Sequence, residues 1–162
     1  MKVLLIRLSS LGDAVLATSA VETLRAARPD AVIDVLTKPA FREVFEGNPA
    51  VRRVFTWEKG EGPRAVAGKL LPEDYGLVAD LHANLRTRLL RFFLPARWSV
   101  YRKGALRRRL AVRLGRPSLL DDTHVADRYC AALLPVAPGA ERKPPRLYPG
   151  DAARKSVRAL LA

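Results

Sequence analysis

The opening stretch of this chain, residues 1–13, constrains its fold more than any other. The apolar run over 2–7 predicts a buried strand, the small residues over 9–12 predict a tight turn, and Asp13 opens a helical pattern. A strand that leads through such a turn into a helix is typical of α/β proteins, which bind ligands at the carboxyl ends of their strands. The turn therefore indicates both a fold class and the edge of the sheet where a site would lie.

The rest of the chain continues the alternation. Apolar runs predict strands over 31–37, 51–57, 75–80 and 98–101, and helical patterns predict helices over 13–27, 41–46, 64–71, 85–94, 105–114 and 124–134. Short connections between strands and helices favour right-handed βαβ units. We therefore expect an α/β fold with a doubly wound, Rossmann-like parallel sheet.

For two of these helices, the spacing of apolar residues predicts which side chains face the core. Over 13–27 the apolar stripe consists of Ala14, Ala17, Val21 and Leu24, with Ala20 and Ala27 beside it. Over 85–94 we expect the apolar side chains Leu85, Leu89, Phe92 and Phe93 to face the core and the arginines to face solvent.

Residues 1–134 are expected to form one domain. The Pro-rich stretch 135–149 has the composition of an interdomain linker, and Asp151 is placed to cap a final amphipathic helix. That helix has no evident partner within 1–134. We therefore expect the 162 residues to be the front half of a two-domain protein, with 135–162 as linker and start of an interdomain helix.

The charge of the chain is strongly basic. It has 29 Lys and Arg against 16 Asp and Glu, a net charge of +13, and the stretch 81–120 is rich in arginine and has no Asp or Glu. Such a field attracts nucleic acid, phosphorylated sugars or an anionic membrane, although solvated helix faces would show the same bias. The single cysteine, Cys130, allows no internal disulfide, and no run is long enough to span a membrane. Without a signal peptide, the expected location is the cytoplasm.

Asp13 has two interpretations. The turn before it lacks both the Gly-Lys-Ser/Thr ending of a P-loop and the Gly-x-Gly-x-x-Gly dinucleotide fingerprint. As an acid in the first turn of a helix, Asp13 would favour the helix macrodipole. As a carboxylate at the ligand edge of a sheet, it could take a proton from a substrate hydroxyl.

Two further polar groups are candidates. Asp80, His82, Asn84 and Arg86 leave the strand 75–80 at the same edge of the sheet and suit a hydroxylated, phosphorylated ligand, unless Asp80 or Asn84 is a helix cap.

Near residue 124, Thr123 is expected to cap a helix, Asp127 to pair with Arg128 at the surface, and His124 to face either a cleft or solvent. The sequence shows no metal-ligand spacing and no compelling Ser-His-Asp arrangement.

The stretches KVLLIRLSSLGDAVLATSAVETLRAARPDAVIDVLTKPAF, EGNPAVRRVF, YGLVADLHANLRTRLL and THVADRYCAALL occur in this order. Together they resemble the ADP-heptose:lipopolysaccharide heptosyltransferase family, from the first residue to about Leu134. Ala83 departs from the family, many of whose members have Gly there.

The resemblance implies the N-terminal domain of a GT-B glycosyltransferase, whose C-terminal nucleotide-sugar domain is absent from this chain. It implies inverting transfer of heptose from ADP-heptose to the lipopolysaccharide inner core, with no cofactor and no metal. Asp13 falls on the residue taken as the general base. The residues expected to bind the acceptor are Arg7, Ser9, Ser10, Gly12, His82, Asn84, Arg86 and His124.

The implied partners are a lipid-linked sugar acceptor and a nucleotide sugar, with peripheral contact to the anionic inner face of the inner membrane. We expect the isolated 162 residues to be inactive as a transferase. Two alternatives stay open: a related GT-B transferase with another glycan acceptor, and a non-catalytic basic domain that binds nucleic acid or anionic membrane. Nucleic acid is the less expected partner, because the sequence has no aromatic-interleaved RNA motif, zinc finger or clear helix-turn-helix.

Overall fold

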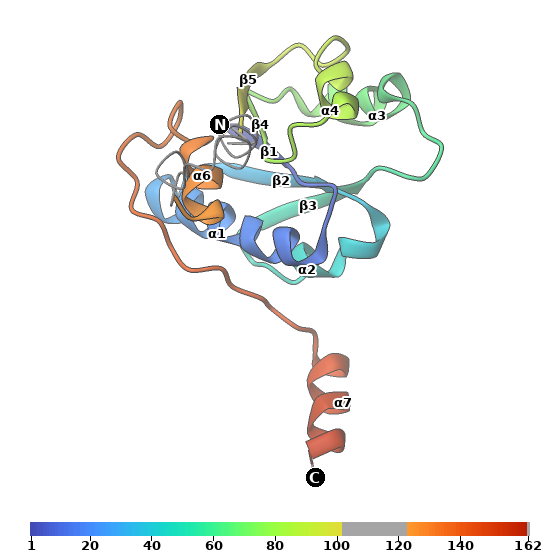
Figure 1. Cartoon of the computed structure of the whole chain (residues 1–162), viewed down its shortest axis with the longest axis vertical. Helices are drawn as coiled ribbons and strands as arrows, with labels where there is room; N and C mark the ends of the chain where they lie inside the picture. The colour runs from blue at the N-terminus through green and yellow to red at the C-terminus, as the bar shows by residue number, and fades with distance from the viewer. Residues whose placement is uncertain (102–122, 162) are drawn as a thin grey trace, which may run out of the picture.

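The chain folds around a five-stranded sheet, as a computed structural model shows for residues 1–101 and 123–161 (Figure 1). The strands are β1 (Lys2–Ile6), β2 (Val32–Thr37), β3 (Val51–Thr56), β4 (Leu77–Asp80) and β5 (Arg97–Val100). They are all parallel and lie in the order β3-β2-β1-β4-β5. The expected Rossmann-like, doubly wound sheet is therefore confirmed.

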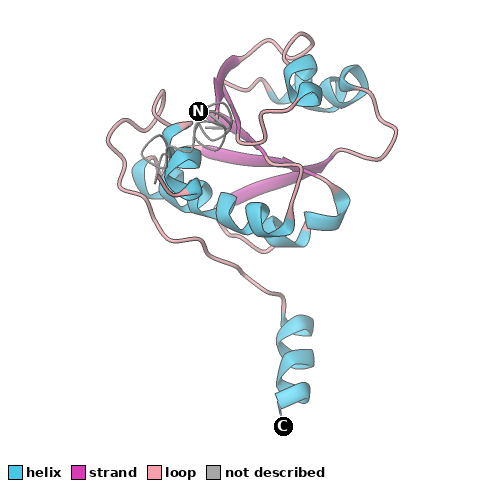
Figure 2. Ribbon diagram, in the orientation of Figure 1, coloured by secondary structure: helices cyan, strands magenta, loops and turns pink. Residues whose placement is uncertain are grey.

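Helices cover both faces of this sheet (Figure 2). They are α1 (Leu11–Ala27), α2 (Glu43–Glu46), α3 (Pro63–Leu70), α4 (Leu85–Leu90), α6 (Val125–Ala131) and α7 (Asp151–Leu161), with 3₁₀ turns η1 (Pro39–Phe41) and η2 (Leu71–Glu73). The helix expected over 105–114 lies outside the described residues. Figure 1 shows α1 beside α6 on one side of the sheet and α3 beside α4 on the other.

The core consists of two apolar layers, one on each face of the sheet. In β1, Val3 and Leu5 pack into the layer under α1, whereas Leu4 and Ile6 pack into the layer under α3 and α4. Every residue of this strand after Lys2 is therefore buried. This is why the strand is apolar without alternation.

The first helix begins two residues before the position expected from sequence. Ser10 is its N-cap residue, and Asp13 is the third residue of its first turn. The predicted stripe is buried, except that Ala27 at the end of α1 is exposed. The helix thus places the Asp13 carboxylate at the carboxyl end of β1, as the sequence pattern indicated.

The predicted face of the helix over 85–94 is wrong. Thr87, Leu90 and Leu94 face the core. The apolar side chains that we expected inside are exposed: Leu85, Leu89, Phe92 and Phe93. The segment carries large apolar residues on two faces, and the face with the spacing 87, 90 and 94 is the one that meets the sheet.

The Pro-rich stretch is not a free linker, because it lies along α1 and is hydrogen-bonded to it. We call residues 139–149 the strap. The backbone N–H groups of Lys143 and Arg146 donate to Oγ1 of Thr23 and Oγ1 of Thr18, at 2.9 and 3.0 Å. Ser19 donates to the carbonyl of Lys143. Small hydroxyl side chains on the outer face of α1 therefore satisfy backbone groups that a proline-rich segment cannot pair within itself.

The strap also packs closely against the turn after α2. A Cβ atom at Gly47 would lie 2.2 Å from the carbonyl oxygen of Tyr148, so this close approach requires glycine. Beyond the strap, α7 extends away from the sheet (Figure 1), and its described side chains are exposed.

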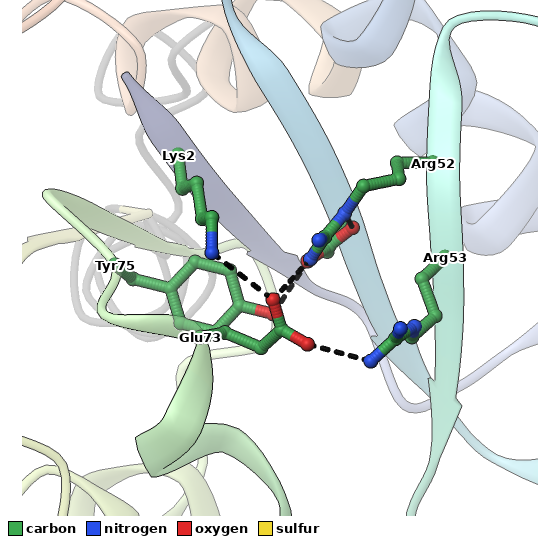
Figure 3. A network of polar contacts seen from close by, with 6 residues as sticks. Lys2, Arg52, Arg53, Glu73 and Tyr75 are labelled. Atoms are coloured by element: carbon green, nitrogen blue, oxygen red, sulfur yellow. Dashed lines mark hydrogen bonds and ion pairs between the residues drawn. The ribbon is translucent and has the colours of Figure 1, made fainter.

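A polar network joins the amino ends of the strands (Figure 3). Asp34, fully buried in β2, accepts hydrogen bonds from Tyr75, at 2.7 Å, and from Arg52. Arg52 also pairs with Glu73, which in turn pairs with Lys2 and Arg53. Because these side chains come from β1, β2, β3 and the segment before β4, the network ties together the end of the sheet opposite Asp13.

Candidate active site

The carboxylate of Asp13 lies where β1 runs into α1, and three other residues hold it. The backbone N–H and the hydroxyl of Ser10 both donate to Oδ2, at 3.2 and 3.1 Å. Arg7 forms an ion pair with the same oxygen. The hydroxyl of Tyr129 in α6 donates to Oδ1 at 3.2 Å. Asp13 is nevertheless only partly buried, so the carboxylate is both fixed and accessible.

Arg7 is the buried centre of this group. Its Nη1 donates to the carbonyl of Leu81 at 2.6 Å, so it joins the carboxyl ends of β1 and β4. Its guanidinium lies 5.3 Å from the ring centroid of Tyr129. The side chain is 9% exposed and, among the described residues, its Nε has no hydrogen-bond partner. Arg7 was expected to bind acceptor anions, but it faces the protein and holds Asp13.

The electrostatic environment keeps Asp13 ionised. Burial acts to raise the pKa of Asp13, but the backbone hydrogen bond from Ser10 and the charge of Arg7 outweigh it. Together with the hydroxyl groups of Ser10 and Tyr129, they hold the pKa of this carboxyl below its ordinary value. The carboxylate is therefore ionised at neutral pH and can accept a hydrogen bond from a hydroxyl group.

Tyr129 is a site residue that sequence reasoning missed. Burial raises the pKa of Tyr129 far above its ordinary value, and the negative charge of Asp13 adds to this, although Arg7 acts in the opposite direction. The hydroxyl therefore stays protonated and donates. Its ring meets the ring of Tyr101 edge-on, with centroids 5.1 Å apart. The signal in the sequence was a large aromatic residue within the predicted helix 124–134.

The turn before Asp13 is open at Ser10 and Gly12. Ser9 is half-buried, and Ser10 and Gly12 are exposed. A Cβ atom at Gly12 would meet no atom within 4 Å. A ligand could therefore approach this turn on the side of Gly12 without displacing protein atoms.

The turn after β4 is built by its own polar side chains. Asp80 accepts hydrogen bonds from the N–H groups of His82 and Ala83, at 3.0 and 2.8 Å. Ala83 has a φ of 50°, in the left-handed region that favours glycine. This geometry explains why a glycine is suited to this position.

Asn84 caps α4, in agreement with its interpretation as a helix cap. Its Oδ1 accepts from the N–H of Thr87 at 2.9 Å. His82 is half-buried and lies in the loop directly after β4, between Asp80 and Asn84 in the sequence. The structure thus places both expected acceptor ligands at the carboxyl end of the strand next to β1.

Arg86 lies over the carboxyl end of β3. Its guanidinium stacks on Trp57, 4.8 Å from the ring centroid, and donates to the carbonyl of Glu61 at 3.2 Å. Trp57 itself is buried and donates to the same carbonyl at 3.0 Å. The ring of Trp57 and the carbonyl of Glu61 therefore orient this arginine.

The cap of α6 differs from expectation. His124, not Thr123, is the N-cap residue, and its Nδ1 accepts from the N–H of Ala126 at 3.2 Å. Asp127 pairs with Arg142 at 2.5 Å instead of Arg128. Both a threonine hydroxyl and a histidine ring nitrogen can accept a hydrogen bond from a backbone N–H group. The sequence pattern therefore does not show which of the two residues caps the helix.

The described residues, 1–101 and 123–161, contain no cluster of three or more His, Cys, Asp or Glu side chains that could hold a metal ion. In the same part of the chain, no helix is both long and apolar enough to cross a bilayer.

Comparison with solved structures places this geometry in a known fold. A glycosyl transferase of family 9 from Veillonella parvula superposes with a TM-score of 0.72 and 21% identity, covering 97% of this chain and 47% of that one. The ADP-heptose lipopolysaccharide heptosyltransferase II of E. coli gives 0.67 and 23%, covering 100% and 51%. The E. coli heptosyltransferase WaaC with ADP gives 0.67 and 16%, covering 91% and 50%.

This chain has a glycosyltransferase fold. It spans about half the length of each of these glycosyltransferases. No family model and no curated protein sequence matches it significantly. In this glycosyltransferase fold, the Asp13 turn occupies the first βα junction of the sheet.

Proposed function

We propose that this chain is the acceptor-binding half of an inverting glycosyltransferase and that Asp13 is its general base. One observation carries the proposal: an ionised, accessible carboxylate is held by Arg7, Ser10 and Tyr129 at the ligand edge of the sheet. A carboxylate that only stabilised the helix terminus would not need a buried arginine and a tyrosine from α6.

The proposed reaction is transfer of heptose from ADP-heptose to a sugar hydroxyl of the lipopolysaccharide inner core. The hydroxyl oxygen attacks the anomeric carbon as the bond to the ADP oxygen breaks, and Asp13 takes the hydroxyl proton. The anomeric centre is inverted, and ADP leaves with the bonding electron pair. General-base catalysis of this kind contributes about 10²–10⁴-fold to the rate.

The other residues support this step in different ways. Arg7 and Tyr129 act as positioning residues, because both are buried and contact Asp13 directly. For the acceptor we propose Ser9, Ser10, Gly12, His82 and Asn84 at the carboxyl ends of β1 and β4, together with Arg86 and with His124 at the start of α6. The basic chain, with a net charge of +13, suits an acceptor that carries phosphates and carboxylates.

The donor and the place of action are also part of the proposal. The matched heptosyltransferases have about twice the length of this chain, and a structure of E. coli WaaC contains ADP-2-deoxy-2-fluoro heptose. We propose that the nucleotide sugar is bound mainly by residues outside these 162, without a cofactor. The reaction would take place in the cytoplasm at the inner face of the inner membrane.

A transferase assay tests the proposal with ADP-heptose and a deacylated inner-core acceptor, comparing wild type with Asp13→Asn. We expect turnover to fall by about 10²-fold or more while acceptor affinity is retained. Asp30→Asn, at an exposed carboxylate beyond α1, is the matched control and should keep full activity. We expect the 162 residues alone to bind the acceptor without transfer, so the assay is also run on the longest polypeptide that contains them. Near-normal turnover of Asp13→Asn would contradict the role of Asp13.

A further inference from the structure

An apolar surface lies on α4 and the turn that follows it. Leu85 and Phe92 are 72% and 82% exposed, and Leu89 and Phe93 are 41% and 43% exposed. The spacing of Leu85, Leu89 and Phe92 places them on one side of consecutive turns. We call these four residues the α4 patch. Large apolar side chains exposed together, instead of singly, indicate an interaction surface.

Three arginines lie close to the α4 patch in the sequence. Arg88 and Arg91 lie between its apolar residues in the sequence, and Arg97 begins the next strand, β5. All three are exposed, and within 1–101 and 123–161 none of them forms an ion pair with a carboxylate. The sequence from Leu81 to Leu120 has no Asp or Glu at all. The surface is therefore both apolar and positively charged.

We propose that the α4 patch docks the protein on an anionic lipid surface. Apolar side chains that enter the boundary between head groups and acyl chains, with arginines at the depth of the phosphates, are the usual composition of a peripheral membrane anchor. Nucleic acid fits less well, because Leu85 and Leu89 would meet phosphate and sugar and gain nothing from burial there. A second copy of the chain fits less well too, because it would bring Arg88 and Arg91 against the same like charges.

The position of the α4 patch fits this partner. Asn84 caps α4 at the carboxyl end of β4, and Arg7 binds the carbonyl of Leu81 just before it. The docking surface thus starts at the sheet edge that carries Asp13. A lipid-linked acceptor, as in the proposed function, would then present its sugar from the surface on which the protein rests.

A vesicle flotation experiment with the 162-residue chain tests the inference. Wild type should bind vesicles of phosphatidylglycerol and phosphatidylcholine, bind pure phosphatidylcholine much more weakly, and lose affinity as salt is raised. Leu85→Ser/Phe92→Ser should weaken binding by at least about 10-fold, and Arg88→Gln/Arg91→Gln should do the same. Because all four side chains are exposed, each variant should keep the thermal melting profile of wild type.

Matched substitutions at other exposed residues test whether the α4 patch is the surface that binds the vesicles. Leu134→Ser/Leu147→Ser removes two apolar side chains that are 56% and 52% exposed, and Lys155→Gln/Arg158→Gln removes two positive charges from α7. Both should bind vesicles as wild type does. The inference is overturned if the α7 variant loses as much affinity as the α4 variants, or if Leu85→Ser/Phe92→Ser binds normally. It is also overturned if that variant changes only the oligomeric state, or only the binding of duplex DNA. Since no sugar transfer is measured, failure here is distinct from failure of the proposed function.

Discussion

The hydroxyl of Tyr129 donates a hydrogen bond to Oδ1 of Asp13, 3.2 Å away and 116 positions earlier in the chain. The two residues lie on α6 and α1, which pack side by side on one face of the sheet. Arg7 is placed to contact both, through an ion pair with Asp13 and the ring face of Tyr129. The carboxylate at the first βα junction is thus held from two other segments.

Tyr129→Phe should weaken the function of Asp13 without removing the residue. Loss of one hydrogen bond should lower turnover about fivefold with the acceptor KM unchanged. The pKa of Asp13 should rise, because the hydroxyl helps to lower it. An NMR titration of the Asp13 carboxyl in the 162-residue chain measures this directly. Tyr101→Phe is the control, since Tyr101 touches the Tyr129 ring but not Asp13. An unchanged titration in Tyr129→Phe would contradict the contact.

Arg7→Met should lower stability and raise the pKa of Asp13. The substitution leaves the carbonyl of Leu81 and the Asp13 carboxylate without their buried donor, at a cost of about 1–3 kcal/mol. Urea denaturation at neutral pH measures the loss. The control is Arg25→Met, because Arg25 is exposed and, within 1–101 and 123–161, its side chain bonds only the nearby carbonyl of Pro29. Equal stability of the two variants would show that Arg7 contributes no more than a surface arginine.

Ala83→Gly should stabilise the protein by about 1 kcal/mol. Ala83 has a φ of 50°, where a Cβ atom is strained and glycine is not. The same substitution at Ala65, exposed in α3, should instead destabilise by about 0.5–1 kcal/mol, because the backbone there is helical. Opposite signs in urea denaturation would confirm the left-handed turn after β4, and a loss at both positions would contradict it.

Glu73→Gln should make the protein less stable at neutral pH but not in acid. Hydrogen bonds from Arg52 lower the pKa of Glu73 from its ordinary 4.5, against the effect of burial, and Lys2 adds to them. The folded state therefore favours ionised Glu73. Its stabilising effect is complete above about pH 4.5 and is lost as the pH falls through the lower folded-state pKa.

Denaturation midpoints of wild type and Glu73→Gln, compared from neutral pH down to about pH 3, check this sign. The gap between them should close in acid. Glu43→Gln, at an exposed glutamate of α2, should follow wild type at every pH. A gap that is constant with pH would show that the charge of Glu73 is not responsible.

The strands and α1 could be predicted from sequence because each has one decisive pattern. The unbroken apolar run of β1 requires cover on both faces, and the small apolar stripe of α1 has a single inward face. The segment after Asn84 has two apolar faces, so its burial depends on which one the tertiary structure selects. This is why the exposure of Phe92 could not be predicted from spacing.

Contacts between distant segments were the other part that the sequence did not predict. Asp13 was found from its place in the first turn, but Tyr129 was not, because a tyrosine in a helix has no feature that indicates an acid on another helix. Asp34 did carry a signal, since a carboxylate inside an otherwise apolar strand must find donors when it is buried. The strand pattern alone could not show that Arg52 and Tyr75 supply them.

The strap has a mechanical consequence for the whole molecule. It is fastened to α1 through Thr18, Ser19 and Thr23, and α7 follows it after Pro149. The same helix carries Asp13 in its first turn. The hydrogen bonds of the strap therefore tie the segment that leads into α7 to the helix that carries the Asp13 carboxylate. A domain attached through α7 would be positioned relative to Asp13 by these hydrogen bonds, and replacing Thr18, Ser19 or Thr23 would loosen that connection without touching the carboxylate.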